Sequence, residues 1–357
     1  MAWTPPLASF RGHRGAVNAL LSDDTTHENV LVSGSDDGSC RLWDVRTARA
    51  SKCINVKKAL GLTGKDDNHE DAAVNALAFG RVPYLYVAAG NKILTFDIRQ
   101  EALILDCAAK ELFMDSDDEI NALSLHPSKG KFLASADDNG DVRIYDVESH
   151  RLYKTLRGQH SNICMAAPFR PSAPWDLVSG GLDGKLLFWD FSRGRMKFCI
   201  DMNAGVSSLA SGGSSAEAPT TNQLFNPPLV HGVAFASNGK SLAAALGDGS
   251  VAVVDFNSKQ VLRRLKNHAA PVSQVHFPVF KHNEWLLSCG NDAKISVFDY
   301  RGALSLDGAT GDRTEEGAFV VKDFLVKQKP NAIATSLHQN VVHVADTSNI
   351  IASYSLL

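Results

Sequence analysis

The chain has 357 residues, of which 44% are hydrophobic and 21% charged, a composition that is typical of globular proteins and excludes wholesale disorder. Its formal net charge of -3 provides no basic field to attract phosphate backbones or anionic lipid, so we expect no direct nucleic-acid partner and no membrane partner. There is no signal-peptide pattern and no CxxC pair among the six cysteines, which predicts reduced core thiols in a protein of the cytoplasm, the nucleus or both.

Six similar hairpins follow one another along the chain. Each consists of an apolar segment, a turn that contains Asp or Asn, and a second apolar segment that ends in Asp. The best-preserved copies are LVSGSDDGSCRLWD (31–44), LVSGGLDGKLLFWD (177–190) and LLSCGNDAKISVFD (286–299). The terminal aspartates are Asp44, Asp97, Asp146, Asp190, Asp255 and Asp299. Their spacing of 44 to 65 residues fits WD repeats of roughly 40 to 45 residues, with loop insertions in the longer intervals.

A histidine precedes the first strand of three repeats at a nearly constant distance from the aromatic residue of the hairpin. This distance is 30, 29 and 30 residues for the pairs His13 and Trp43, His160 and Trp189, and His268 and Phe298. Short β-branched segments broken by Gly, Asp and Asn predict strands, and no amphipathic helix of ten or more residues is evident. We therefore predict an all-β fold, a seven-bladed WD40 β-propeller.

The seventh blade is predicted to be divided between the two ends of the sequence. Residues 329–357 contain three strand-like segments, AIATSL, VVHVAD and IIASYSL. Residues 6–11 precede the first Gly-His and are expected to supply the fourth strand, which closes the ring. A single domain is thus expected over residues 1–357, with flexible insertions at 206–223 and 305–318, where the composition is polar and rich in Gly.

Three groups of residues have the composition of a catalytic His-Ser-Asp set, but we interpret each as a structural tetrad. An enzyme needs such a constellation once, whereas here it recurs with an aromatic residue at the same offset. Buried polar groups require mutual hydrogen bonds, because an unsatisfied one costs roughly 1 to 3 kcal/mol. The tetrads are His13, Ser33, Asp37 and Trp43; His160, Ser179, Asp183 and Trp189; and His268, Ser288, Asp292 and Phe298.

No catalytic residue, cofactor or metal is expected. The chain has no HExxH motif and no close Cys pair, and its twelve histidines lack the spacing of metal ligands. A propeller hydrolase is the alternative from the enzyme class. It would require a unique polar cluster at the propeller axis, and the sequence does not show one.

Three hairpins are followed by arginine two residues after the terminal aspartate, and a strand end does not itself require arginine there. Guanidinium groups are suited to bidentate pairing with the carboxylates of a partner. Residues 31–46 resemble the sixteen-residue box of receptors that dock on the damaged-DNA-binding protein 1 adaptor of cullin-4 ubiquitin ligases. The resemblance implies an adaptor box and equivalent positions at Trp43, Asp44, Arg46, Arg99 and Arg301.

From the third blade onward the chain resembles the WD repeat-containing protein 53 family. The segments HSNIC, FRP and QLFNPPLVH carry this resemblance and are not generic propeller motifs. It implies a substrate receptor of a cullin-4 ligase. We expect a non-enzymatic protein that binds the adaptor at the end with the arginines and an unidentified substrate protein at the other, and that is monomeric apart from its partners. The alternative is a scaffold subunit of another assembly, in chromatin or ribosome maturation, in which the arginines are incidental.

Overall fold

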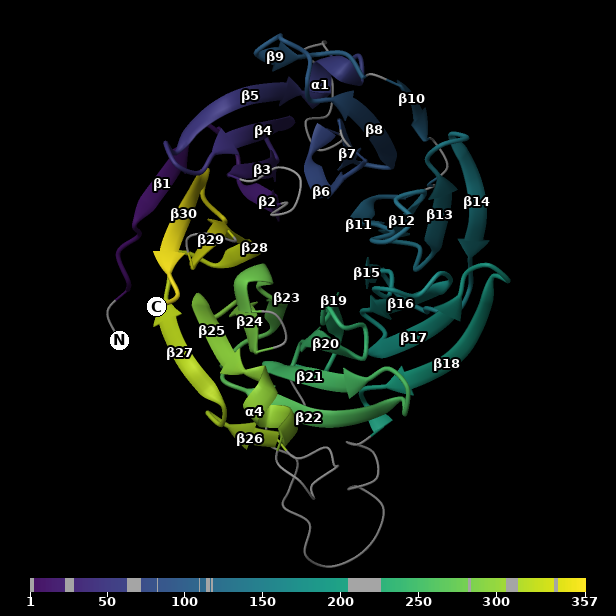
Figure 1. Cartoon of the computed structure of the whole chain (residues 1–357), viewed down its shortest axis with the longest axis vertical. Helices are drawn as coiled ribbons and strands as arrows, with labels where there is room; N and C mark the ends of the chain where they lie inside the picture. The colour runs from purple at the N-terminus through teal and green to yellow at the C-terminus, as the bar shows by residue number, and fades with distance from the viewer. Residues whose placement is uncertain are drawn as a thin grey trace, which may run out of the picture.

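Seven β-sheets surround a central axis in the computed structural model, which describes residues 3–22, 29–62, 72–81, 83–108, 110–113, 116, 118–204, 226–281, 284–305, 314–336 and 340–357. Figure 1 looks down this axis and shows the sheets as the blades of a ring. The predicted all-β, seven-bladed β-propeller is therefore confirmed. Within each blade we call the strands a, b, c and d from the axis outward.

The first three blades each have strands a to d in antiparallel order. Blade 1 contains β2 (Val17–Ser22), β3 (Val30–Ser35), β4 (Ser39–Asp44) and β5 (Arg49–Asn55). Blade 2 contains β6 (Val74–Phe79), β7 (Tyr84–Ala89), β8 (Lys92–Asp97) and β10 (Lys110–Phe113). Blade 3 contains β11 (Ile120–Leu125), β12 (Phe132–Asp137), β13 (Val142–Asp146) and β14 (Arg151–Leu156).

The next three blades follow the same order. Blade 4 contains β15 (Cys164–Ala166), β16 (Asp176–Gly181), β17 (Lys185–Asp190) and β18 (Arg195–Asp201). Blade 5 contains β19 (Val230–Phe235), β20 (Ser241–Leu246), β21 (Ser250–Asp255) and β22 (Gln260–Lys266). Blade 6 contains β23 (Val272–His276), β24 (Trp285–Gly290), β25 (Lys294–Asp299) and β27 (Val320–Leu325). In all six blades strand c ends at the aspartate that closes the hairpin in the sequence.

Blade 7 is assembled from both ends of the chain. It contains β28 (Pro330–Ser336), β29 (Val341–Asp346), β30 (Ile350–Ser355) and, as its outermost strand, β1 (Ala8–Arg11). The pairing of β1 with β30 is antiparallel and places Phe10 opposite Ile351. Phe10 also packs edge-on against Trp43 of blade 1, with ring centroids 5.7 Å apart. The N-terminal strand therefore joins the last blade to the first through both backbone and core.

Adjacent blades approach closely because small residues occupy one position of strand b. A Cβ atom built on Gly34 would clash with Val74 Cγ1 of blade 2. At the equivalent position of blade 4, a Cβ atom on Gly180 would lie 2.5 Å from Val230 Cγ1 of blade 5. Strand b is consequently buried on both faces, which explains why its sequence is continuously apolar or small rather than alternating.

The sheets of blades 1 and 5 each have a fifth strand, which pairs with strand d and comes from the chain segment of the following blade. β9 (Ile104–Leu105) pairs in parallel with β5, and β26 (Thr314–Glu316) pairs in parallel with β22. In both cases the chain leaves strand c of its own blade, runs along the outer edge of the preceding blade, and then returns as strand d. The added strands cover backbone groups that would otherwise form an open sheet edge.

Helical segments are short: α1 (Val56–Ala59), η2 (Val279–Lys281) and α4 (Tyr300–Ser305). The insertion predicted at residues 305–318 has secondary structure at its ends, because Ser305 completes α4 and β26 pairs in parallel with β22. The insertion predicted at 206–223 lies outside the described residues. No helix in the described ranges has both the length and the apolar character needed to cross a membrane.

The two ends of the propeller differ in the strands that they connect. At one end, which we call the b–c end, strand b turns into strand c; in blade 1 this is where Val17 lies opposite Ser35. At the other, the c–d end, strand c turns into strand d, and Asp44 lies opposite Arg49.

All six cysteines are free thiols, and three of them, Cys40, Cys164 and Cys289, are buried. Cys107 is exposed, so the prediction that the cysteines are core residues is wrong for it.

Candidate functional site

The tetrad of blade 1 forms a continuous chain of hydrogen bonds. Trp43 Nε1 donates to Ser33 Oγ at 2.8 Å, and this hydroxyl lies 2.7 Å from His13 Nε2. His13 Nδ1 lies 3.1 Å from an Asp37 carboxylate oxygen. Because Nδ1 faces a carboxylate, it carries a proton and donates it to Asp37. Both nitrogens of the imidazole therefore have a hydrogen-bond partner, and the ring connects the strands of one blade.

Blade 4 repeats this chain, whereas blade 6 shortens it. In blade 4, Trp189 Nε1 and His160 Nε2 each lie 2.8 Å from Ser179 Oγ, and His160 Nδ1 lies 3.0 Å from Asp183. In blade 6 the corresponding distances are 2.7 Å between His268 Nε2 and Ser288 Oγ and 3.0 Å between His268 Nδ1 and Asp292. The aromatic position is Phe298, which is buried but has no N–H group to donate. Three copies of one buried chain support a structural role rather than catalysis.

The cost of removing a tetrad serine should follow the number of its hydrogen-bond partners. Ser33→Ala leaves both Trp43 Nε1 and His13 Nε2 without a partner, and we expect the free energy of unfolding to fall by about 2–4 kcal/mol. Ser288→Ala deprives only His268, so a smaller loss of about 1–2 kcal/mol is expected. Urea denaturation of the two variants measures the difference. Equal losses would contradict the role of Ser33 as the acceptor for Trp43.

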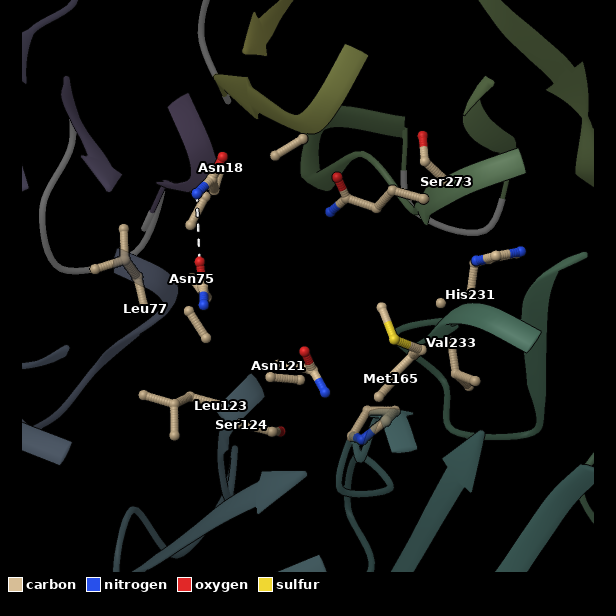
Figure 2. A pocket seen from close by; sticks show the side chains of 18 of the residues that line it. Asn18, Asn75, Leu77, Asn121, Leu123, Ser124, Met165, His231, Val233 and Ser273 are labelled. Atoms are coloured by element: carbon tan, nitrogen blue, oxygen red, sulfur yellow. Dashed lines mark hydrogen bonds between the residues drawn. The ribbon is translucent and has the colours of Figure 1, made fainter. Parts of the chain in front are cut away.

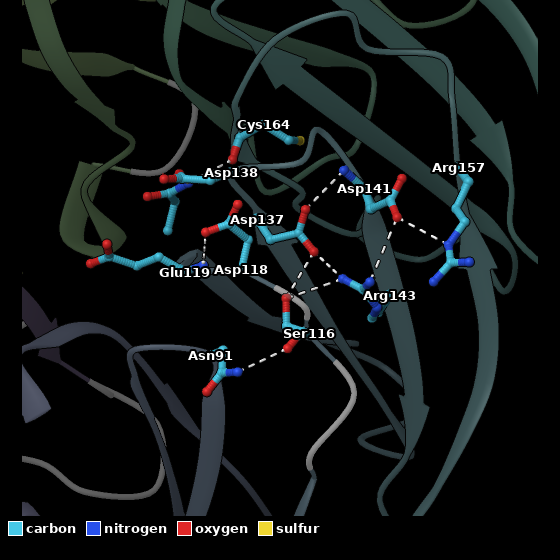
Figure 3. A network of polar contacts seen from close by, with 11 residues as sticks. Asn91, Ser116, Asp118, Glu119, Asp137, Asp138, Asp141, Arg143, Arg157 and Cys164 are labelled. Atoms are coloured by element: carbon cyan, nitrogen blue, oxygen red, sulfur yellow. Dashed lines mark hydrogen bonds and ion pairs between the residues drawn. The ribbon is translucent and has the colours of Figure 1, made fainter. Parts of the chain in front are cut away.

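Blade 3 carries a buried charged network in place of a tetrad (Figure 3). Arg143 and Asp137 form an ion pair in which each side chain is 1% exposed, and Arg143 Nη2 lies 3.6 Å from Asp141. Ser116 Oγ donates to Asp137 at 2.9 Å and accepts from Arg143 Nη1 at 3.1 Å. Asn91 Nδ2 of blade 2 donates to the Ser116 carbonyl at 3.1 Å, so the network also connects two blades.

Blade 7 has a third kind of buried polar group, centred on His343 in the middle of strand b. Its Nε2 lies 2.7 Å from Ser336 Oγ and its Nδ1 lies 2.7 Å from Ser353 Oγ. Burial lowers the pKa of His343 to about 4, so the imidazole is neutral near pH 7. The sequence patterns did not reveal this group or the Arg143 network. The available signal was a single polar residue inside an otherwise apolar strand, His in VVHVAD and Arg in VRIYD.

Arg46 and Arg99 adopt the same geometry at the c–d ends of blades 1 and 2. Arg46 Nε and Nη2 donate to the two oxygens of Asp44 at 3.0 and 2.8 Å, and the Arg46 backbone N–H donates to the same carboxylate at 2.9 Å. Arg99 binds Asp97 in the same way, at 3.3, 3.0 and 3.0 Å. The side chains are 66% and 68% exposed. The bidentate edge of each guanidinium is therefore used within the chain, and its outer face is presented to solvent.

The other members of the predicted adaptor box are placed differently. Arg301 lies in α4 rather than in a turn, and the Asp299 carboxylate caps that helix by accepting the Gly302 N–H at 2.8 Å. Arg301 is therefore not equivalent to Arg46, although it has the same offset in the sequence. Trp43 is only 1% exposed and belongs to the buried tetrad, so it cannot be a contact residue. Of the predicted positions, Asp44, Arg46 and Arg99 are the ones that share the exposed arginine–aspartate geometry.

A cavity of about 470 Å³ lies on the axis, among the a strands of the blades (Figure 2). Asparagine recurs in it at the second position of strand a, as Asn18, Asn75, Asn121 and Asn331. Met165, His231 and Ser273 occupy the corresponding position in blades 4, 5 and 6. This ring is not among the features predicted from the sequence. The repeated strings VNAL, VNAL, INAL and PNAI were the signal for it.

The asparagines connect neighbouring blades through their amide N–H groups. Asn18 Nδ2 donates to Asn75 Oδ1 at 3.3 Å, and Asn331 Nδ2 donates to the Val17 carbonyl at 3.1 Å. Asn121 Nδ2 donates to the Cys164 carbonyl at 3.3 Å. These contacts explain the recurrence as a seam between blades. Within the described part of the chain, no group of three or more His, Cys, Asp and Glu side chains is arranged to hold a metal ion.

Comparison with known proteins places these features in a family context. Residues 5–173 match the model of the Nucleolar protein 10-like N-terminal domain, and residues 259–299 match the WD domain, G-beta repeat. The chain is 30% identical to the WD repeat-containing protein 53 homolog of Dictyostelium discoideum over 95% of this chain and 91% of that protein.

Two further relatives cover less of their own length. The WD repeat-containing protein ATCSA-1 of Arabidopsis thaliana is 25% identical over 70% of this chain and 52% of that protein. The ribosome biogenesis protein YTM1 of Yarrowia lipolytica is 25% identical over 51% of this chain and 35% of that protein. Relatives of this chain differ in their names, and one is a ribosome biogenesis protein, so fold alone does not identify the partner of this chain.

Proposed function

Because this chain belongs to the WD repeat-containing protein 53 family of WD-repeat interaction scaffolds, we propose that it is a substrate receptor that docks on the damaged-DNA-binding protein 1 adaptor of a cullin-4 ubiquitin ligase. The observation that supports this proposal most directly is the pair of arginines Arg46 and Arg99. Consecutive blades present two guanidinium groups in one pose at one end of the propeller. The b–c end then remains available for a substrate protein.

The arginine pairs are better suited to recognition than to stability. An exposed ion pair contributes roughly 0–1 kcal/mol to folding, so neither pair is needed to hold the blades together. The internal bond to Asp44 or Asp97 restricts the rotamers of each arginine, and a partner that binds it loses less side-chain entropy. The Arg46 bond to Asp44 lowers the pKa of that carboxyl, and Arg99 lowers the pKa of Asp97 in the same way. Both pairs therefore stay charged at neutral pH.

A hollow at the same end provides apolar surface beside the charges. It has a volume of about 670 Å³ and lies between the a–b turns of blades 1, 2 and 3. Phe79, Arg81 and Leu125 contribute to its lining. The Ile98 N–H donates to the Pro83 carbonyl at 3.0 Å, which ties the segment that carries Arg99 to the neighbouring a–b turn. A combination of arginine and partly buried aromatic surface is typical of the energetically important part of protein interfaces.

The double variant Arg46→Ala/Arg99→Ala is expected to reduce capture of the purified adaptor by about tenfold or more, since each lost charge-assisted contact costs roughly 1.5–3 kcal/mol. The thermal midpoint should change little. Arg193→Ala/Arg301→Ala is the matched control, because it removes the same charge from the c–d end. Arg193 is 78% exposed and lies three residues after Asp190 rather than two. Capture that is unchanged by the first variant, or lost equally in both, contradicts the proposal.

A second candidate is a scaffold role in ribosome maturation. It is favoured by the match of residues 5–173 to the Nucleolar protein 10-like domain and by the similarity to YTM1. Affinity purification of the tagged chain from cells distinguishes the two roles. Recovery of pre-ribosomal proteins, without the adaptor and independently of Arg46 and Arg99, would replace the receptor proposal with this one.

A further inference from the structure

The ring of asparagines leaves a row of unused acceptors on one wall of the axial cavity. The Nδ2 group of Asn18 donates to Asp36, that of Asn121 donates to Asp138, and that of Asn331 donates to the Val17 carbonyl. With the amide N–H groups bound in this way, each side chain has its Oδ1 atom left. No described residue donates a hydrogen bond to Oδ1 of Asn18, Asn121 or Asn331. The wall formed by blades 7, 1 and 3 therefore offers three amide oxygens as acceptors.

Three carboxylates accept hydrogen bonds from the asparagines of the cavity. Asp36 accepts from Asn18 at 2.5 Å, Asp138 accepts from Asn121 at 2.7 Å, and Glu119 accepts from Asn75. No lysine or arginine of the described residues lies within ion-pair distance of these three carboxylates. Acids at the c–d end differ in this respect, since Asp44 and Asp97 are each paired with an arginine. The cavity mouth at the b–c end therefore has three carboxylates that no described lysine or arginine pairs directly.

The opposite wall combines the apolar side chains of Met165 and Val233 with the polar side chains of His231, Ser273 and Gln274. Figure 2 shows Met165, Val233 and His231 across the cavity from Asn18 and Asn75. Burial, together with the nearby charge of Lys329, lowers the pKa of His231, so its imidazole is neutral near pH 7. The cavity volume of about 470 Å³ is within the range of pockets that hold small ligands or single side chains. Its walls thus suit a group that is cationic at its tip and aliphatic along its stem.

We propose that the axial cavity binds an arginine side chain presented by an extended segment of a partner protein at the b–c end. A guanidinium has five N–H donors and no acceptor, which complements amide oxygens backed by carboxylates. Its methylene stem packs against Met165 and Val233. This inference rests on the proposed receptor function in one respect, because it names the type of substrate side chain that would bind at the end opposite the adaptor. The cavity itself is independent of Arg46 and Arg99.

Binding of two matched peptides to the full chain tests this site. The probes are fluorescein-labelled Gly-Ala-Ala-Arg-Ala-Ala-Gly and the same peptide with citrulline, which keeps the shape of arginine and removes its charge. Fluorescence polarisation should show saturable binding of the arginine peptide, about tenfold tighter than the citrulline peptide, as expected for the loss of one charge-assisted contact. Equal affinities, or no saturable binding of the arginine peptide, would overturn the proposal.

Variants then locate the binding site. Asp36→Asn/Glu119→Gln/Asp138→Asn preserves the side-chain shapes and should weaken binding of the arginine peptide about fivefold or more, with a weaker dependence on salt. Asp201→Asn is the matched control, because Asp201 is an exposed acid near the end of β18, the outermost strand of blade 4, and should bind normally. Binding that survives the triple variant unchanged overturns the site.

The outcome is separable from that of the adaptor experiment. Arg46→Ala/Arg99→Ala should bind the arginine peptide as the unaltered chain does, even if adaptor capture is lost. If the triple variant fails to fold, Asn121→Leu provides the second test, since it removes one acceptor from the wall and keeps all the carboxylates. Normal peptide binding by a folded Asn121→Leu variant would contradict the proposed contact.

Discussion

Phe10→Ala is expected to lower the free energy of unfolding by about 3–5 kcal/mol, the range found for truncation of a buried phenylalanine. The ring is 1% exposed and packs edge-on against both Trp43 of blade 1 and His343 of blade 7, with centroid distances of 5.7 Å in each case. Its loss opens a cavity at the junction that closes the propeller. Only four residues, Ala8–Arg11, pair with β30, and the Leu7 N–H adds a bond to the Ser353 carbonyl at 2.7 Å.

Urea denaturation followed by far-ultraviolet circular dichroism measures this loss. Arg11→Ala is the control on the same strand, because Arg11 is exposed and its truncation should change stability by less than about 0.5 kcal/mol. A loss below about 1 kcal/mol for Phe10→Ala would show that blade 7 is stable with its N-terminal strand detached.

Arg143→Met should be of comparable severity, with a loss of about 3–5 kcal/mol, because it leaves a buried carboxylate without its counter-charge. Burial already raises the pKa of Asp137, against the opposing effects of its hydrogen bonds and of the Arg143 charge. Removal of the arginine raises that pKa further. The double variant Arg143→Met/Asp137→Asn should therefore be more stable than Arg143→Met alone, since no isolated charge remains in the core.

The control for this network is Arg157→Ala. Arg157 Nε lies 3.1 Å from Asp141, but its side chain is 63% exposed, so the expected loss is below about 1 kcal/mol. Thermal and urea unfolding of the three variants give the order. If the double variant is less stable than Arg143→Met, the arginine does not act mainly as the counter-charge of Asp137.

The sequence was sufficient for features that repeat along the chain. The hairpins and the tetrads recur with nearly fixed spacing, and each depends on contacts within one blade, so a local pattern is enough to predict them. Closure by the N-terminal strand was also predictable, because the segment 329–357 contains three strand-like segments and a propeller blade has four.

Features that depend on neighbouring blades were not predicted. β9 and β26 are short and lack a strand pattern of their own; they pair because the outer edge of the preceding blade happens to lie beside them. The environment of Arg143 requires Ser116, which lies 27 residues earlier and shares no motif with it. For Arg301 the sequence pattern predicted an equivalence that the structure does not have. Its offset matches that of Arg46, but α4 replaces the turn and changes the direction of the chain.

Closure of the ring by β1 also orders events on the ribosome. Ala8–Arg11 leaves the exit tunnel long before Ile350–Ser355, the strand with which it must pair. During most of synthesis, Phe10 therefore has neither its His343 contact nor its backbone partners, and the nascent chain is an open arc with an unpaired edge at its leading end. Such edges and exposed aromatic side chains are the surfaces that chaperones bind on nascent chains. The N-terminal strand can be released from chaperones only after the last blade has been synthesised.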